Sequence, residues 1–151
     1  MDGRRRFSIR IISLSSNNEP EDLITGTSGN VVWSSDSDHF FYVKKDPITL
    51  IANSVYLHRI GTSQEKDKLI FQEKDQEFDI SISRSASTEY LLINSESTDS
   101  NEYYFINLSK REATPRLFLK RKAKHLYYLE QYENSIYMRS NLDAQNFKLL
   151  A

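Results

Sequence analysis

Three features of this sequence predict an all-β fold. Segments rich in aromatic and β-branched residues alternate with short clusters of Ser, Asp, Asn and Gly along the whole chain. No segment keeps a helical period over three turns. The stretch LKRKAKHLYYLEQYENS comes closest, but its adjacent aromatic pairs and its polar turn at 133–135 favour strands. The strand-like segments also recur at a nearly constant spacing.

The expected strands fall into sets of up to four. The clusters SSDSD, SRSASTE and QYENS each separate a first strand from a second and supply turn residues. In chain order the strands are FSIRIISL and EDLI; then NVVW, HFFYV, SVYLHRI and KLIFQ; then FDISIS, YLLIN, EYYFINL and RLFLK; and finally LYYLEQY, SIYMRS and NFKLL.

The sets repeat every 44 to 48 residues. Third strands align on Phe7, Val55, Tyr103 and Phe147, and fourth strands align on Leu23, Ile70 and Phe118. A four-stranded unit with a period of about 40–50 residues is typical of a β-propeller blade.

We therefore expect a partial β-propeller within a single domain that spans residues 1–151. The repeat predicts two complete blades over residues 30–74 and 78–120. Partial blades are expected over residues 1–25, as the end of an earlier blade, and over residues 125–151. An ordinary β-sandwich is the alternative, but its strands would alternate more clearly between apolar and polar residues.

The strand HFFYVKK is apolar on both of its faces. Phe40 and Tyr42 point to one side, whereas Phe41 and Val43 point to the other. Stacked blades explain this pattern, because each middle strand is covered by a neighbouring blade on both sides. Charged residues that discourage edge pairing are expected beside the outermost, fourth strands, and Lys68, Lys74 and residues 120–122 stand there.

Composition excludes several classes of protein. The chain has 151 residues, 38% hydrophobic residues, a net charge of −1 and no cysteine. It is too rich in apolar residues to be disordered, and its charge does not favour nucleic acid. Arg10 interrupts the apolar run near the N-terminus, and no window is long enough to cross a bilayer. We expect a cytoplasmic protein with no nucleic-acid or membrane partner.

Several motifs resemble the N-terminal propeller of oligopeptidase B (protease II), a group within the prolyl oligopeptidase family of serine peptidases. They are DGRRRFSIRI, VVWSSDSDHFFYVKKDPITL, VYLHRIGT, KLIFQEKDQEFDISISRSAS, KHLYYLEQYENSIYMRSN and NFKLL. The sequence departs from the usual pattern at Asp46-Pro47, at Ile51-Ala52 and at Leu57, where the family commonly has Arg. These changes leave the spacing of the strands intact.

The resemblance implies a seven-bladed propeller that caps an α/β-hydrolase domain, so that short peptides are cleaved after Arg or Lys and folded proteins are excluded. It implies that the Ser-Asp-His triad lies in the hydrolase domain. We expect that domain to be absent from this chain, which should be inactive alone. The expected partner is the remainder of the peptidase, with its missing blades and hydrolase domain, supplied as a separate chain where the gene is split.

Few residues in the sequence suggest catalytic chemistry. The segment Gly26-Thr27-Ser28-Gly29 is one residue short of a G-x-S-x-G nucleophile elbow, and we interpret it as a loop between blades. His39, His58 and His125 are isolated and are expected to be surface or strand-end residues. We therefore predict no catalytic residue, no metal site and no cofactor.

Charged clusters are expected to serve solubility. The basic clusters at residues 4–6 and 119–125 are interpreted as solvated edges and blade connections. The acidic pairs Glu65/Asp67 and Glu73/Asp75 are expected in turns, although they could instead line a tunnel or meet the hydrolase domain.

The leading hypothesis for function is a non-catalytic propeller segment of an oligopeptidase-B-like serine peptidase, which helps to filter substrates by size. Two alternatives remain. One is a stand-alone interaction module built from propeller blades. The other is an inactive product of a truncated or split gene.

Overall fold

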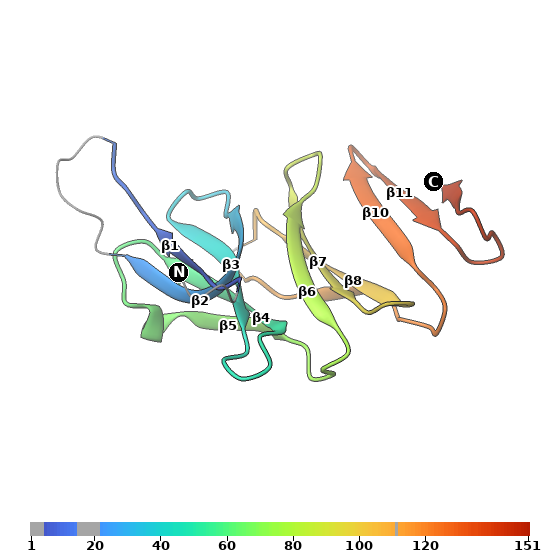
Figure 1. The fold of residues 1–151 in the computed structure, drawn as a ribbon. Helices are drawn as coiled ribbons and strands as arrows, with labels where there is room; N and C mark the ends of the chain where they lie inside the picture. Colours follow the sequence, from blue (N-terminus) through green and yellow to red (C-terminus); the bar gives the residue numbers. More distant parts are fainter. Residues whose placement is uncertain (1–4, 15–21, 111) are drawn as a thin grey trace.

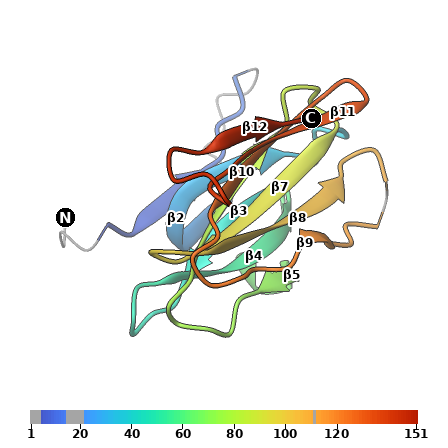
Figure 2. The ribbon, with the colours of Figure 1, turned by 90° about the vertical axis from the view of Figure 1, so that its right-hand side faces the viewer.

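Three antiparallel sheets follow one another along the chain (Figure 1). The computed structural model describes residues 5–14, 22–110 and 112–151. When the molecule is viewed from the side of its C-terminal sheet, the three sheets lie one behind another (Figure 2). The all-β class predicted from the sequence is confirmed, and the flat faces of successive sheets meet as a blade arrangement requires.

The first sheet has five strands in the order β1-β2-β3-β4-β5. A short 3-10 turn, η1 (Gln64–Lys66), precedes the last of these strands. The strands are β1 (Phe7–Arg10), β2 (Leu23–Trp33), β3 (His39–Lys45), β4 (Ala52–Arg59) and β5 (Lys68–Gln72).

The second and third sheets have four and three strands, again in sequence order. Each strand therefore pairs with its neighbour in the chain, which is the local connectivity that short turns produce. The second sheet contains β6 (Asp79–Arg84), β7 (Tyr90–Glu96), β8 (Asn101–Asn107) and β9 (Arg116–Leu119). The third contains β10 (Tyr127–Tyr132), β11 (Ser135–Ser140) and β12 (Lys148–Leu150).

Two hydrophobic clusters join the three sheets. The larger cluster lies between the first two sheets and includes Phe41 and Val43 from β3 with Leu91 and Ile93 from β7. The second lies between the last two sheets and includes Leu92, Tyr103, Tyr127 and Leu129. Burial of apolar area between sheets is the main favourable contribution to the free energy of folding.

The expectation that middle strands are covered on both faces is confirmed. Phe41 and Val43 of β3 face the second sheet, whereas Phe40 and Tyr42 belong to a third cluster on the opposite face. Ile9 and Ile11, from the N-terminal segment, pack against that third cluster. Phe40 and Tyr42 are thus covered on this face by residues of the same chain.

The N-terminal strands differ from the expectation of a separate partial blade over residues 1–25. Strand β1 pairs with residues 23–27 of β2, as predicted for a third and a fourth strand, but β2 continues to Trp33 and its second half pairs with β3. Gly26 and Gly29 have φ angles of 70° and 89°, and the register shifts between Thr27 and Val31. Because glycine tolerates positive φ, the strand bends without ending, and both halves share one sheet.

We predict that the face between the first two sheets dominates stability. Ile93→Ala should lower the free energy of unfolding by about 2–5 kcal/mol, because Ile93 is fully buried and its loss leaves a cavity. Ile48→Ala is the matched control, since Ile48 is 88% exposed, and should change it by less than about 0.5 kcal/mol. Urea denaturation followed by circular dichroism measures both, and equal losses would contradict the packing described.

Candidate functional site

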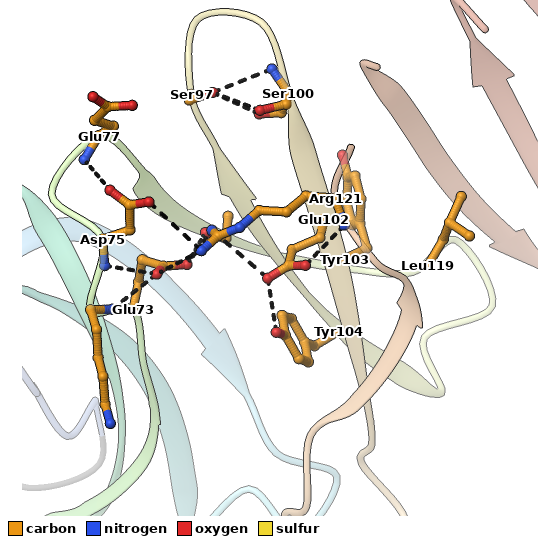
Figure 3. A network of polar contacts seen from close by, with 12 residues as sticks. Glu73, Asp75, Glu77, Ser97, Ser100, Glu102, Tyr103, Tyr104, Leu119 and Arg121 are labelled. Carbon is orange, nitrogen blue, oxygen red and sulfur yellow. Dashed lines mark hydrogen bonds and ion pairs between the residues drawn. The ribbon is translucent and has the colours of Figure 1, made fainter. Parts of the chain in front are cut away.

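The connectors between successive sheets meet at one end of the molecule. Residues 73–78 lead from β5 to β6, and residues 120–126 lead from β9 to β10. Glu73 is the first residue after β5, and Arg121 lies two residues after the end of β9. These side chains point toward each other across the second sheet (Figure 3). We call Glu73, Asp75, Glu102 and Arg121 the connector clamp.

Arg121 is the centre of the connector clamp. Its Nη1 lies 2.8 Å from Oε2 of Glu73 and its Nη2 lies 3.3 Å from Oε1, a two-pronged ion pair. Weaker ion pairs reach Glu102 at 3.8 Å and Asp75 at 4.0 Å. The guanidinium also lies 3.9 Å from the centre of the Phe78 ring, a cation–π contact.

Both buried carboxylates of the clamp have further hydrogen-bond donors. Ser95 donates its hydroxyl to Glu73 at 2.7 Å, and the backbone N–H of Asp75 donates to the same carboxylate at 2.9 Å. Glu102 accepts from the Tyr104 hydroxyl at 2.9 Å and from the backbone N–H of Arg121 at 3.1 Å. The clamp therefore has the full hydrogen bonding that a buried carboxylate needs to remain charged.

The contacts of the clamp shift the pKa values of Glu73, Arg121 and the neighbouring Tyr104. Burial acts to raise the pKa of Glu73, but hydrogen bonds from Arg121 and Ser95 outweigh it and the pKa is lowered. Burial acts to lower the pKa of Arg121, but its pairing with Glu73 outweighs this effect and the pKa is raised. Burial, with the hydrogen bond to Glu102, raises the pKa of Tyr104 to about 12. All of these groups keep fixed protonation states at neutral pH, which suits a structural lock and not proton transfer.

A second polar cluster lies inside the first sheet. His58 is fully buried, and its Nδ1 lies 2.7 Å from Oδ1 of Asp67. The Tyr42 hydroxyl donates to the other oxygen of Asp67 at 2.8 Å. Nε2 of His58 lies 3.6 Å from Asp22, which accepts the backbone N–H of Gly61 at 2.6 Å. The cluster ties β4 to the turn before β5 and to the start of β2.

The histidines correct one expectation from the sequence. His39 begins β3 and is half-buried beside Asp36, at 2.8 Å, as a strand-end residue. His58 and His125 are instead buried. Nε2 of His125 lies 2.9 Å from the Ser140 hydroxyl, and burial, with the charge of Lys122, lowers the pKa of His125. Because Ser140 is fully buried, this Ser–His pair is inaccessible to a substrate and is a packing contact.

An open cleft of about 640 Å³ lies between the first two sheets at their other end. Phe41, Leu57 and Ile106 line it together with the pair formed by Asp36 and His39. Ser35 donates its hydroxyl to the Leu108 carbonyl at 2.6 Å, which joins the two sheets beside the cleft. These contacts hold sheets together and place no nucleophile against a base.

The remaining sequence-predicted segments have structural roles. Gly26 to Gly29 is part of β2 and not a loop, although both glycines have positive φ angles. Glu65 is exposed in η1, whereas the Asp67 side chain is buried in contact with His58 and Glu73 is buried and ion-paired with Arg121, so neither is merely a turn residue. Arg5 and Arg6 are exposed, and Arg4 lies outside the described residues.

Sequence reasoning missed the clamp, although the repeat contains a signal for it. Glu73 and Arg121 are 48 residues apart, which is the period of the repeat. They therefore occupy equivalent positions in successive connectors, and equivalent positions of stacked repeats are neighbours in space. An acidic and a basic residue separated by one period of the repeat, as Glu73 and Arg121 are, therefore indicate an ion pair between successive connectors.

Two negative findings apply to the described residues. Within them, no group of three or more His, Asp or Glu side chains is arranged to hold a metal ion. In the same part of the chain, no helix has the length and apolar character needed to traverse a lipid bilayer.

We predict that the clamp contributes to stability because its two glutamates are buried and Arg121 is only 27% exposed. Arg121→Met should lower the free energy of unfolding by about 1–3 kcal/mol, since Glu73 would lose its partner. Arg59→Met is the matched control, because the Arg59–Asp38 pair is 65% and 53% exposed, and should cost less than about 1 kcal/mol. Chemical denaturation distinguishes the two, and similar costs would contradict a buried clamp.

The lowered pKa of Glu73 predicts a pH dependence. Its charged form stabilises the fold above its ordinary pKa of 4.5, and this stabilisation is lost as the pH falls through the lower folded-state pKa. Glu73→Gln should therefore be less stable than the parent at neutral pH, and the difference should shrink below about pH 4.5. Thermal melts of parent and variant from neutral pH to below about pH 4.5 test this difference. Glu65→Gln, at an exposed position, is the control and should melt like the parent at neutral pH. If the stability difference between the parent and Glu73→Gln grew as the pH falls, the predicted direction of the pH dependence would be wrong.

Comparison with known proteins places this geometry in a family. Residues 1–151 match the family described as prolyl oligopeptidase, N-terminal β-propeller domain. Dipeptidyl aminopeptidase BI from Pseudoxanthomonas mexicana is 33% identical over 99% of this chain and 21% of its own length. Protease 2 from Moraxella lacunata is 30% identical over 99% of this chain and 22% of its own length.

A solved structure gives the same result. Oligopeptidase B from Leishmania major superposes with a TM-score of 0.92 at 29% identity, over 98% of this chain and 21% of that chain. The chain thus spans about a fifth of the length of these relatives. Its three antiparallel sheets are part of a β-propeller domain, and the chain belongs to the prolyl oligopeptidase N-terminal β-propeller family.

Proposed function

We propose that this chain forms part of the propeller of an oligopeptidase-B-like serine peptidase, in which it acts as a non-catalytic wall. The observation that carries the proposal is the match of nearly the whole chain, in sequence and in fold, to a propeller portion of such peptidases. In that setting, residues 30–74 and 78–120 are complete blades and residues 125–151 begin another.

The packing of the sheets supports a steric role. A wall that excludes folded proteins must resist separation of its blades, and here the first two sheets share a continuous buried cluster. The connector clamp adds an ion pair between the buried Glu73 and the half-buried Arg121, in the segments that lead into the second and third sheets. Interfaces built in this way are close-packed and deform little, so the wall keeps its shape.

The proposal assigns bond breaking to another part of the peptidase. The described Ser–His pair is buried, and Glu73 and Arg121 of the clamp are charged partners of each other, so neither supports nucleophilic attack. We propose that a hydrolase domain, in the same polypeptide or a separate one, cleaves short peptides after Arg or Lys, and that this chain limits what reaches it. Without cysteine, the chain suits a reducing, cytoplasmic location.

We predict that the purified chain alone does not hydrolyse a short fluorogenic peptide with Arg before the cleaved bond. Co-expression with a polypeptide that supplies the other blades and the hydrolase domain should give hydrolysis that a serine-directed inhibitor blocks. The reconstituted enzyme should spare a folded protein that carries the same cleavage sequence. Inhibitor-sensitive turnover by this chain alone would refute the proposal.

A second outcome would also count against it. If the hydrolase polypeptide cleaves short peptides and folded proteins equally well with and without this chain, the chain does not filter substrates. The Ile48→Ala variant of this chain, which changes an exposed residue, is the control. In the reconstituted enzyme it should give the same selectivity as the unaltered chain.

A further inference from the structure

One nitrogen of His58 is buried without a hydrogen-bond partner. The imidazole is fully buried, and its Nδ1 lies 2.7 Å from Oδ1 of Asp67. Among the described residues, Nε2 of His58 is the one buried side-chain nitrogen or oxygen that makes no hydrogen bond. It faces Asp22, whose Oδ2 lies 3.6 Å away, and the apolar ring of Phe40 lies 5.0 Å from the imidazole. The imidazole therefore lies between two buried carboxylates, since the side chains of Asp67 and Asp22 are 1% and 4% exposed.

A neutral imidazole does not suit this position. It has one N–H and one lone pair, and a carboxylate can only accept hydrogen bonds. With the proton on Nδ1, the lone pair of Nε2 faces Asp22; with the proton on Nε2, the lone pair of Nδ1 faces Asp67. Either tautomer thus places a lone pair against a buried negative charge. The imidazolium form, in contrast, presents an N–H to both carboxylates.

No other cation balances the two aspartates within the part of the chain that the structure describes. No Lys or Arg side chain there lies within ion-pair distance of either carboxylate. Their other donors are neutral: the Tyr42 hydroxyl donates to Asp67, and the backbone N–H of Gly61 donates to Asp22. Burial raises the pKa of Tyr42, so this hydroxyl keeps its proton. Because a buried carboxylate needs a compensating charge, His58 is the group that can supply it.

The two aspartates belong to segments that little backbone pairing joins. Asp22 directly precedes β2, and Asp67 lies between η1 and β5. We call β1 and residues 23–27 of β2 the N-terminal arm. Within the arm, only Thr27 pairs with β3, opposite Lys44, and the register shifts directly after it. The arm therefore depends on side-chain contacts to stay docked on the rest of the first sheet.

Side chains of the turn before β5 supply such contacts. Gln64 accepts the backbone N–H of Thr25 at 3.1 Å and donates to the Thr25 carbonyl at 3.1 Å, as a neighbouring strand would. Asp22 accepts the backbone N–H of Gly61 at 2.6 Å, and Ile9 of β1 packs against the third hydrophobic cluster. The contact between Asp22 and the imidazole belongs to the same set. It is the member of the set whose charge can change near neutral pH.

We propose that His58 is an imidazolium held between Asp22 and Asp67, and that its charge acts as a pH-sensitive latch for the N-terminal arm. The charge stabilises the docked arm while both nitrogens are protonated. This stabilisation is lost as the pH rises and the second proton leaves, because the lone pair of Nε2 then faces Asp22. The sequence repeat assigns the arm to an earlier blade, so in a longer propeller the latch joins two successive blades. The inference is independent of the proposed function, since its tests measure charge and amide protection and not activity.

Nitrogen NMR of the complete chain, labelled in its histidines, measures the charge. At about pH 7.5, above the ordinary histidine pKa of about 6.5, His58 should give the signals of two protonated nitrogens. His125 is the internal control, because it is also buried but lies against the Ser140 hydroxyl, and burial lowers its pKa. It should give the signals of a neutral ring. A neutral His58 at this pH would overturn the proposal.

Hydrogen exchange tests the latch. As the pH is raised until His58 loses its second proton, the protection factors of the arm amides should fall by about tenfold with the same midpoint, while those of β7 stay constant. Asp22→Asn places an amide donor beside Nε2, so His58 should be neutral at about pH 7.5 and the arm should lose its pH dependence. His39→Gln, at a half-buried histidine paired with Asp36, is the matched control and should keep the parental dependence. Arm protection that stays constant while His58 deprotonates would overturn the latch.

Discussion

The need to cover both faces of the apolar middle strands is the constraint on which this structure depends. In β3, Phe41 and Val43 pack against the second sheet, and Phe40 and Tyr42 are buried on the opposite side. A single sheet of this kind would leave a large apolar area in water on at least one side. Contact with a neighbouring sheet removes this area from water, and the stacking of the sheets follows from the apolar pattern of their middle strands.

Polar contacts between the connectors add to the apolar packing between the sheets. Hydrophobic burial is non-directional, so it brings two sheets together without fixing their relative angle. The connector clamp adds direction: Arg121 holds Glu73 through two parallel hydrogen bonds and stacks on Phe78. Glu73 lies in the connector that leaves the first sheet and Arg121 in the connector that leads to the third, so the clamp joins these two connectors beside the second sheet. A rigid wall needs both kinds of contact.

The proposed role needs no reactive group in this chain. The histidines that catalysis could have used are committed to structure, with His58 held by Asp67 and His125 beside Ser140. A steric filter acts through shape and stiffness, so its important residues are those that resist deformation. This is why the site of interest here is an interface between sheets and not a pocket with a nucleophile.

The sequence by itself determined the strands, their order and the repeat, because aromatic and β-branched enrichment, turn residues and spacing are local properties that each blade repeats. It also indicated that segments such as HFFYV are buried on both faces. Only the tertiary structure decided that β2 runs unbroken through Gly26 and Gly29, that His58 is buried, and that Glu73 meets Arg121. Those outcomes depend on which groups the fold brings together from distant positions, and a charge or an imidazole looks the same in sequence whether water or a buried partner satisfies it.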